Sequence, residues 1–135
     1  MPARTRLAQL IDEEEGFGRA GVIPTVRHNP GDLRHSPHST HPGGPAHADD
    51  IGTIDNDDDG FADLERQLEI DAGMGAKYGF NPAPPCMTLA QAIYTWAPAE
   101  DGNNPGKYLS DVLEGFHGAV TADTPLDQVL QIPAE

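Results

Sequence analysis

The sequence predicts a single, mostly α-helical domain with a long irregular loop after its first helix. Three observations support this prediction. Apolar residues recur at spacings of three and four in several segments, no segment shows the alternation of a strand, and residues 18–59 have no apolar period. The 135 residues suffice for one domain with an ordinary core, so we expect residues 1–135 to fold as one unit.

The first helix is expected between Thr5 and Gly16. Thr5 is a suitable N-cap, because its hydroxyl can accept a hydrogen bond from the backbone of the first turn. Gly16 is typical of the position just beyond a helix end. The apolar stripe of this helix consists of Leu7, Leu10 and Ile11.

Residues 18–59 are expected to be a loop. They contain five of the six histidines and many prolines and glycines. A loop of this length inside a compact domain is usually either functional or disordered. This segment is therefore the first place to look for a site.

Four further helices are expected from their start signals. These signals lie near Gly60, at Thr88, at Asn104-Pro105 and at Thr124-Pro125, where proline suits the first helical position. The last helix is short, over residues 125–132. The expected inward-facing residues are Phe61, Leu64 and Leu68, then Leu89, Ile93 and Trp96, and then Tyr108, Leu109, Val112, Leu113 and Phe116.

Charge narrows the range of partners. The chain has 22 acidic and 8 basic residues, a formal net charge of −14. A protein that binds a phosphate backbone needs a positive surface, so we expect no nucleic-acid partner. The same charge argues against adhesion to an anionic membrane.

Targeting signals are not recognisable. No window approaches the roughly 18 apolar residues of a membrane span, so no membrane insertion is expected. The N-terminus MPARTRLAQLIDEEEG lacks the apolar run of a signal peptide, which predicts synthesis in a cytoplasm. The lone Cys86 cannot form an internal disulfide.

The acidic run Glu13-Glu14-Glu15 ends the first helix. Acidic side chains at a helix C-terminus face the negative end of its dipole, which is mildly unfavourable. The ordinary interpretation is a solvated helix end. Glu15, the last of the three, can instead leave the helix and face a cleft, where partial desolvation would raise its pKa as a general acid requires.

Four segments in order carry a resemblance to a known family. They are Glu15-Gly16-Phe17, the turn NPGDLR, the helix DGFADLERQL and the segment TLAQAIYTWAPAEDGNNPGKY. This set resembles the phage-type lytic transglycosylases of the lysozyme-like superfamily, and it covers roughly Leu7 to Phe116. Each motif alone is weak, and the ordered set is more specific.

The resemblance implies cleavage of the peptidoglycan glycan strand at the β-1,4 bond between N-acetylmuramic acid and N-acetylglucosamine. Glu15 matches the catalytic acid, the loop 18–59 would form one wall of the cleft, and no cofactor or metal is expected. The positions that match the sugar-contacting residues of the family are Asn29, Gly31, Arg34, Tyr94 and Tyr108. Asp32 departs from the pattern, because asparagine is more usual there.

The family relation also implies a setting. Such a protein would be an endolysin in the cytoplasm of an infected host, or it would be carried in a virion with virion or tail proteins as partners. An alternative is a non-catalytic virion or tail component that keeps this fold for assembly or wall binding. Hydrolysis in place of transglycosylation also stays open, because it depends on whether water reaches the intermediate.

A third hypothesis is a zinc-dependent peptidoglycan peptidase. Four loop histidines are followed by Asp49 and Asp50, and such residues can bind zinc. The run STHPGGPAHADD is close to the signature of D-alanyl-D-alanine peptidases, but Ala48 stands where that signature needs aspartate. The four histidines are His35, His38, His41 and His47.

The acidic loop 55–60 fits the first six positions of a calcium-binding EF-hand loop. The twelfth position should be glutamate but is Arg66, and Glu65 comes one residue too early. The favoured interpretation is an acidic start for the following helix, because acidic residues there complement the helix dipole.

Overall fold

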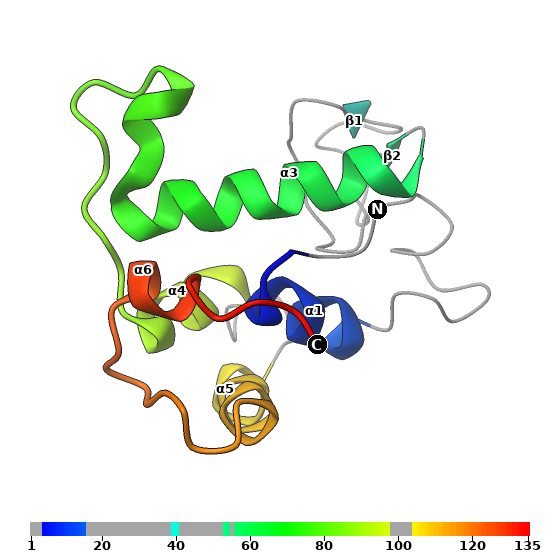
Figure 1. Ribbon diagram of the computed structural model, residues 1–135, viewed down its shortest axis with the longest axis vertical. Helices are drawn as coiled ribbons and strands as arrows, with labels where there is room; N and C mark the ends of the chain where they lie inside the picture. The colour runs from blue at the N-terminus through cyan, green and yellow to red at the C-terminus, as the bar shows by residue number, and fades with distance from the viewer. Residues whose placement is uncertain (1–3, 16–38, 41–52, 55, 98–103) are drawn as a thin grey trace.

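The computed structural model describes residues 4–15, 39–40, 53–54, 56–97 and 104–135, and it is mostly helical, as predicted (Figure 1). The α-helices are α1 (Arg6–Glu14), α3 (Asp57–Glu69), α4 (Leu89–Trp96), α5 (Pro105–Gly115) and α6 (Leu126–Val129). Helix α3 continues through the π-helix η2 (Ile70–Met74) and the 3₁₀-helix η3 (Gly75–Tyr78). The expected short helix in 125–132 corresponds to α6.

Two short strands lie where no strand was predicted. Strand β1 (Ser39–Thr40) pairs antiparallel with β2 (Thr53–Ile54), with Ser39 opposite Ile54. Each strand has two residues, which is too few for an alternating pattern to be recognised in the sequence.

The core is built around α1, which packs against both α3 and α5 (Figure 1). All the side chains predicted to face inward either belong to this core or pack against it. Burial of these apolar side chains is the main favourable contribution to folding. The largest fully buried apolar side chains are Leu7, Ile11, Leu64, Leu68, Leu89, Ile93, Val112, Leu126 and Val129.

Three predicted N-caps are confirmed. The side chains of Thr5, Thr88 and Asn104 each accept the backbone N–H of the third residue in the helix that follows. Thr88 also forms a capping box with Gln91. Pro105 is the first residue of α5, as expected.

Helix α3 starts three residues before the predicted position near Gly60. The Asn56 side chain accepts the Asp59 N–H at 2.9 Å and so caps a first turn made of three aspartates, Asp57–Asp59. The interpretation of the acidic run as a helix start is therefore confirmed for its described part. Asp55 lies outside the described residues.

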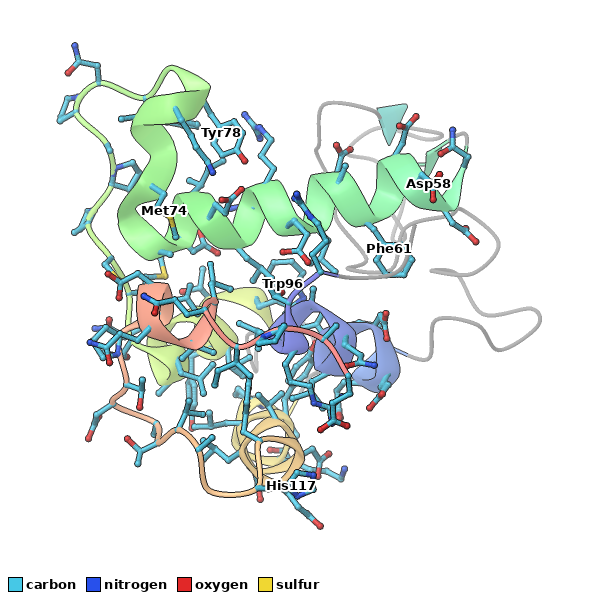
Figure 2. All side chains as sticks on the ribbon, viewed as in Figure 1. Asp58, Phe61, Met74, Tyr78, Trp96 and His117 are labelled. Atoms are coloured by element: carbon cyan, nitrogen blue, oxygen red, sulfur yellow. The ribbon has the colours of Figure 1, made fainter. Side chains whose placement is uncertain are left out.

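The segment that begins with α3 ends in a turn. The regular α-helix ends at Glu69, and the chain turns at Gly73, where φ is 85°. Glycine suits this conformation because it has no Cβ to clash with the backbone. Lys77 and Tyr78 then both bond to the Glu69 carboxylate, which holds η3 close to the end of α3 (Figure 2).

The start of α1 is held by a carboxylate from α3. Glu65 is 3% exposed, and its Oε1 accepts hydrogen bonds from Arg4 N at 2.9 Å, Thr5 N at 3.0 Å and Thr5 Oγ1 at 3.2 Å. A carboxylate at a helix N-terminus satisfies backbone donors that have no partner within the helix. Glu65 therefore has a structural role. This role explains the presence of a glutamate after the acidic run, and no calcium ion is needed to explain it.

Helices α1 and α5 are in close contact at Gly115. The guanidinium of Arg6, near the start of α1, donates to the Gly115 carbonyl at 3.2 Å, near the end of α5. A Cβ on Gly115 would lie 2.3 Å from Leu10 Cδ2, so a larger residue at this position would require the Leu10 side chain to move. Arg6 is 9% exposed and also donates to Gln9 at 2.7 Å.

Within the described ranges, none of the helices combines the length and the apolar character needed to cross a membrane.

Replacing Glu65 by alanine should destabilise the protein by about 2–4 kcal/mol, because three donors near the start of α1 lose a charged acceptor. Denaturant unfolding followed by circular dichroism measures this change. The matched control is Glu114→Ala, which removes an exposed carboxylate from α5 and should change the stability by less than about 0.5 kcal/mol. Equal effects of the two substitutions would contradict this role of Glu65.

Candidate active site

The structure brings together two residues that the sequence analysis named, Glu15 and Tyr108. Glu15 follows the last residue of α1 and is half-buried, and Tyr108 lies in the first turns of α5 and is 7% exposed. The Tyr108 hydroxyl donates a hydrogen bond to Glu15 Oε1 at 3.2 Å. This contact joins residues 93 positions apart in the chain.

The packing of α1 on α5 explains this meeting. The start of α1 contacts the end of α5 through Arg6 and Gly115, and the residue that follows α1 contacts the first turns of α5 through Glu15 and Tyr108. The Asn104 cap fixes where α5 begins and therefore where Tyr108 stands along it. A hydroxyl can both donate and accept, so Tyr108 can accompany Glu15 in either protonation state.

Of the other predicted sugar-contacting residues, the structure describes Tyr94. Asn29, Gly31 and Arg34, together with Asp32, lie outside the described residues, as does most of the loop 18–59. Tyr94 on α4 is 51% exposed. Its hydroxyl lies 3.8 Å from the position that a Cβ on Gly106 would take.

The Tyr94 side chain therefore lies near a different side of α5 from the side that carries Tyr108. Positions 106 and 108 are two residues apart, which is about 200° around a helix. Trp96, two residues after Tyr94, packs against the core, as predicted (Figure 2). Within the described residues, Tyr108 is thus the tyrosine that reaches Glu15, and Tyr94 is an aromatic side chain at the surface of α4.

Asp12 is a candidate that the sequence analysis did not name. Partial burial, with a smaller contribution from the charge of Glu13, raises the pKa of Asp12 to about 7. Asp12 stands one turn before Glu15 on the same side of α1. Asp12 follows the buried Ala8 by four residues, and this spacing could have indicated that Asp12 stands at the edge of the apolar stripe.

A second pair of carboxyl groups belongs to the same two helices. Glu14 of α1 and Asp111 of α5 line the same hollow, and Lys107 Nζ lies 2.7 Å from Asp111 Oδ2. Burial and then the charge of Asp111 raise the pKa of Glu14. The hydrogen bond from Lys107 holds the pKa of Asp111 below its ordinary value.

This pair lines a hollow of about 390 Å³ between α1 and α5. Its charged lining is mostly acidic and includes Glu13 and Glu114 besides the pair. A second hollow of about 420 Å³ lies between α3, α6 and the start of α1, next to the buried Glu65. That hollow is lined by neither Glu15 nor Tyr108.

Metal binding has no support in the described residues. They contain no group of three histidine, cysteine, aspartate or glutamate side chains close enough to hold a metal ion. His117, the histidine beyond the loop, is exposed beside the end of α5 (Figure 2). The histidines from His35 to His47 lie outside the described residues.

Comparisons with protein-family models, with curated proteins and with solved structures found no match.

The raised pKa of Asp12 predicts a change of stability with pH. A group whose pKa is raised in the folded state stabilises the fold fully below its ordinary value of 3.8, and this contribution is lost as the pH rises through about 7. The substitution Asp12→Asn should therefore stabilise the protein at pH 8 by on the order of 1–2 kcal/mol, after allowance for solvent screening. Near pH 4 the variant and the wild type should differ little.

Urea unfolding at several pH values between 4 and 8 measures this difference. The control is Asp123→Asn, which changes an exposed aspartate and should leave the pH dependence as it is in the wild type. A stability of Asp12→Asn that follows the wild type at every pH would show that burial does not disfavour the ionised form of Asp12.

Proposed function

We propose that this protein is a peptidoglycan lytic transglycosylase with a lysozyme-like fold, and that Glu15 is its catalytic acid and base. The observation that carries the proposal is the hydrogen bond between Tyr108 and Glu15. These residues come from two separate segments of the resemblance, one matching the catalytic acid and the other a sugar-contacting position. Their contact supports the proposal, because segments of a real active site must converge in space.

The reaction needs one carboxyl group that acts twice. Protonated Glu15 gives its proton to the glycosidic oxygen between N-acetylmuramic acid and N-acetylglucosamine, and the bond from the muramoyl C1 to that oxygen breaks. The resulting carboxylate then takes the proton of the muramoyl 6-hydroxyl, whose oxygen bonds to C1. The product carries a 1,6-anhydro ring, no water is consumed, and Glu15 regains its proton.

The Tyr108 hydroxyl suits both halves of this cycle. It can accept a hydrogen bond from the protonated Glu15 carboxyl group, and it can donate one to the carboxylate formed after the first step. Because Tyr108 is nearly buried and stands on a capped helix, it holds Glu15 in one position during both steps. Correct placement of a catalytic group accounts for a large share of enzymatic rate enhancement.

The setting that we propose is lysis of a bacterial host or entry through its wall, as an endolysin or a virion-associated enzyme of a bacteriophage. The hydrolase and the transglycosylase differ in their products by one water molecule. Mass spectrometry of digested sacculi therefore separates anhydro ends from reducing ends. A protein that binds sacculi without cleaving them would instead be a non-catalytic wall-binding or virion component.

The substitution Glu15→Gln should reduce the release of anhydro-muropeptides by at least about 10²-fold, because the amide cannot supply the proton. Glutamine keeps the shape of the side chain and can still bond to Tyr108, so the melting temperature should change little. The control is Glu13→Gln, an exposed neighbour on the same helix. Full activity of Glu15→Gln would refute the assignment of Glu15.

The substitution Tyr108→Phe should lower kcat about tenfold and leave KM nearly unchanged, because the ring stays in place while the hydroxyl that positions Glu15 is lost. The matched control is Tyr78→Phe, which removes a hydroxyl on η3 that is hydrogen-bonded to Glu69 of α3. Steady-state kinetics on soluble glycan strands measures both constants. If the two variants lose activity equally, the hydrogen bond to Glu15 has no special role.

A further inference from the structure

The hollow between α3, α6 and the start of α1 has a charged lining that the fold leaves incompletely paired. Its volume of about 420 Å³ lies within the roughly 300–1,000 Å³ of small-molecule sites. Neither Glu15 nor Tyr108 lines this hollow, so it is separate from the candidate active site. Its charged residues are Arg4, Glu65, Glu69 and Asp127.

The buried Glu65 carboxylate has one oxygen that can accept a further hydrogen bond. Its Oε1 accepts the backbone N–H groups of Arg4 and Thr5, at 2.9 and 3.0 Å. Its Oε2 lies 3.2 Å from the Thr5 hydroxyl, and the single proton of that hydroxyl is shared with Oε1 at the same distance. A carboxylate oxygen has two acceptor sites, so Oε2 can bind another donor, and a positively charged donor binds most strongly.

Two exposed charged side chains of the hollow are also available. Within the part of the chain that the structure describes, neither the Arg4 guanidinium nor the Asp127 carboxylate forms an ion pair or a hydrogen bond. Glu69 differs from them, because Lys77 and Tyr78 already bond to its carboxylate. The hollow therefore offers one basic group and two acidic groups, the second acidic group being Oε2 of Glu65.

These groups lie at two ends of the hollow with apolar side chains between them. Arg4 and Glu65 form one end, and the segment after α6 returns to Arg4 through a backbone hydrogen bond of 3.1 Å. Asp127 stands at the other end, in the first turn of α6, which packs against η2. Leu130 follows Asp127 by about one helical turn, and Met74 of η2 lies beside α6 (Figure 2).

We propose that this hollow binds a basic α-amino acid, of which lysine is the simplest example. The α-carboxylate pairs with Arg4, and the α-ammonium donates to Glu65 Oε2. The four-carbon stem lies on Met74 and Leu130, and the side-chain ammonium pairs with Asp127. Two positive charges and one negative charge of the ligand thus meet two acidic groups and one basic group. The inference goes beyond the proposed function and uses none of its residues.

Two analogues of lysine report on the two ends of the hollow separately. Norleucine keeps the α-carboxylate and the α-ammonium but lacks the side-chain ammonium that pairs with Asp127. Cadaverine keeps two ammonium groups and the stem but lacks the carboxylate that pairs with Arg4. Each analogue therefore leaves one charged group of the site without a partner.

A nuclear magnetic resonance titration of the full chain with L-lysine tests the proposal. The backbone amide signals of Leu130 and Gln131, which line the hollow, should shift to saturation. The Kd of lysine should be at least about threefold lower than the Kd of norleucine and of cadaverine, because each analogue lacks one ion pair. Equal affinities for the three compounds, or shifts that do not saturate with lysine, would overturn the proposal.

Two substitutions of exposed side chains assign the ends. Arg4→Gln should weaken the binding of lysine and norleucine at least about threefold and leave cadaverine unchanged. It keeps the backbone N–H that bonds to Glu65, so the start of α1 stays in place. Asp127→Asn should weaken lysine and cadaverine by a similar factor and leave norleucine unchanged. If either variant keeps the affinity of the wild type for lysine, the assignment of that end is wrong and the proposal fails.

The matched control is Asp123→Asn, which changes an exposed aspartate shortly before α6 that does not line the hollow. All three affinities should stay as they are in the wild type. A loss of lysine binding equal to that of Asp127→Asn would show an effect of net charge alone and would refute the site. The titration contains no glycan, so its failure and the failure of the proposed lytic activity are distinguishable.

Discussion

The buried carboxylate of Glu65 is the constraint on which the candidate site depends. It binds the backbone at Arg4 and Thr5 and so fixes where α1 begins. Helix α1 has nine residues, roughly 14 Å of rise, and its far end is therefore fixed as well. Because Glu65 belongs to α3, the longest described α-helix determines where Glu15 stands relative to the core.

Local sequence signals were sufficient to predict where the helices lie. The caps at Thr5, Thr88 and Asn104 and the apolar spacings act within a few residues, so they can be recognised without knowing the fold. The early start of α3 was missed because three consecutive aspartates resemble a loop until Asn56 is seen to cap them. The two-residue strands carry no pattern at all.

The site was only partly predictable for the same reason. Glu15 and Tyr108 could be named from motifs, but their contact joins residues 93 apart, and the hollow that Glu14 and Asp111 line depends on the register of two helices. The formal net charge of −14 also overstates the negative charge near α1. Partial burial raises the pKa of Asp12 to about 7 and also raises the pKa of Glu14, so this region carries less negative charge than a residue count gives.

Gly115 has a consequence for how such a site can change over evolutionary time. It lets α1 and α5 touch at one end, while the reactive groups lie at the other end, so the angle between the helices sets the spacing of those groups. A side chain at this position would displace the Leu10 side chain of α1. A single methyl group, placed far from the chemistry, can thereby retune the geometry of Glu15 without altering any residue that meets the substrate.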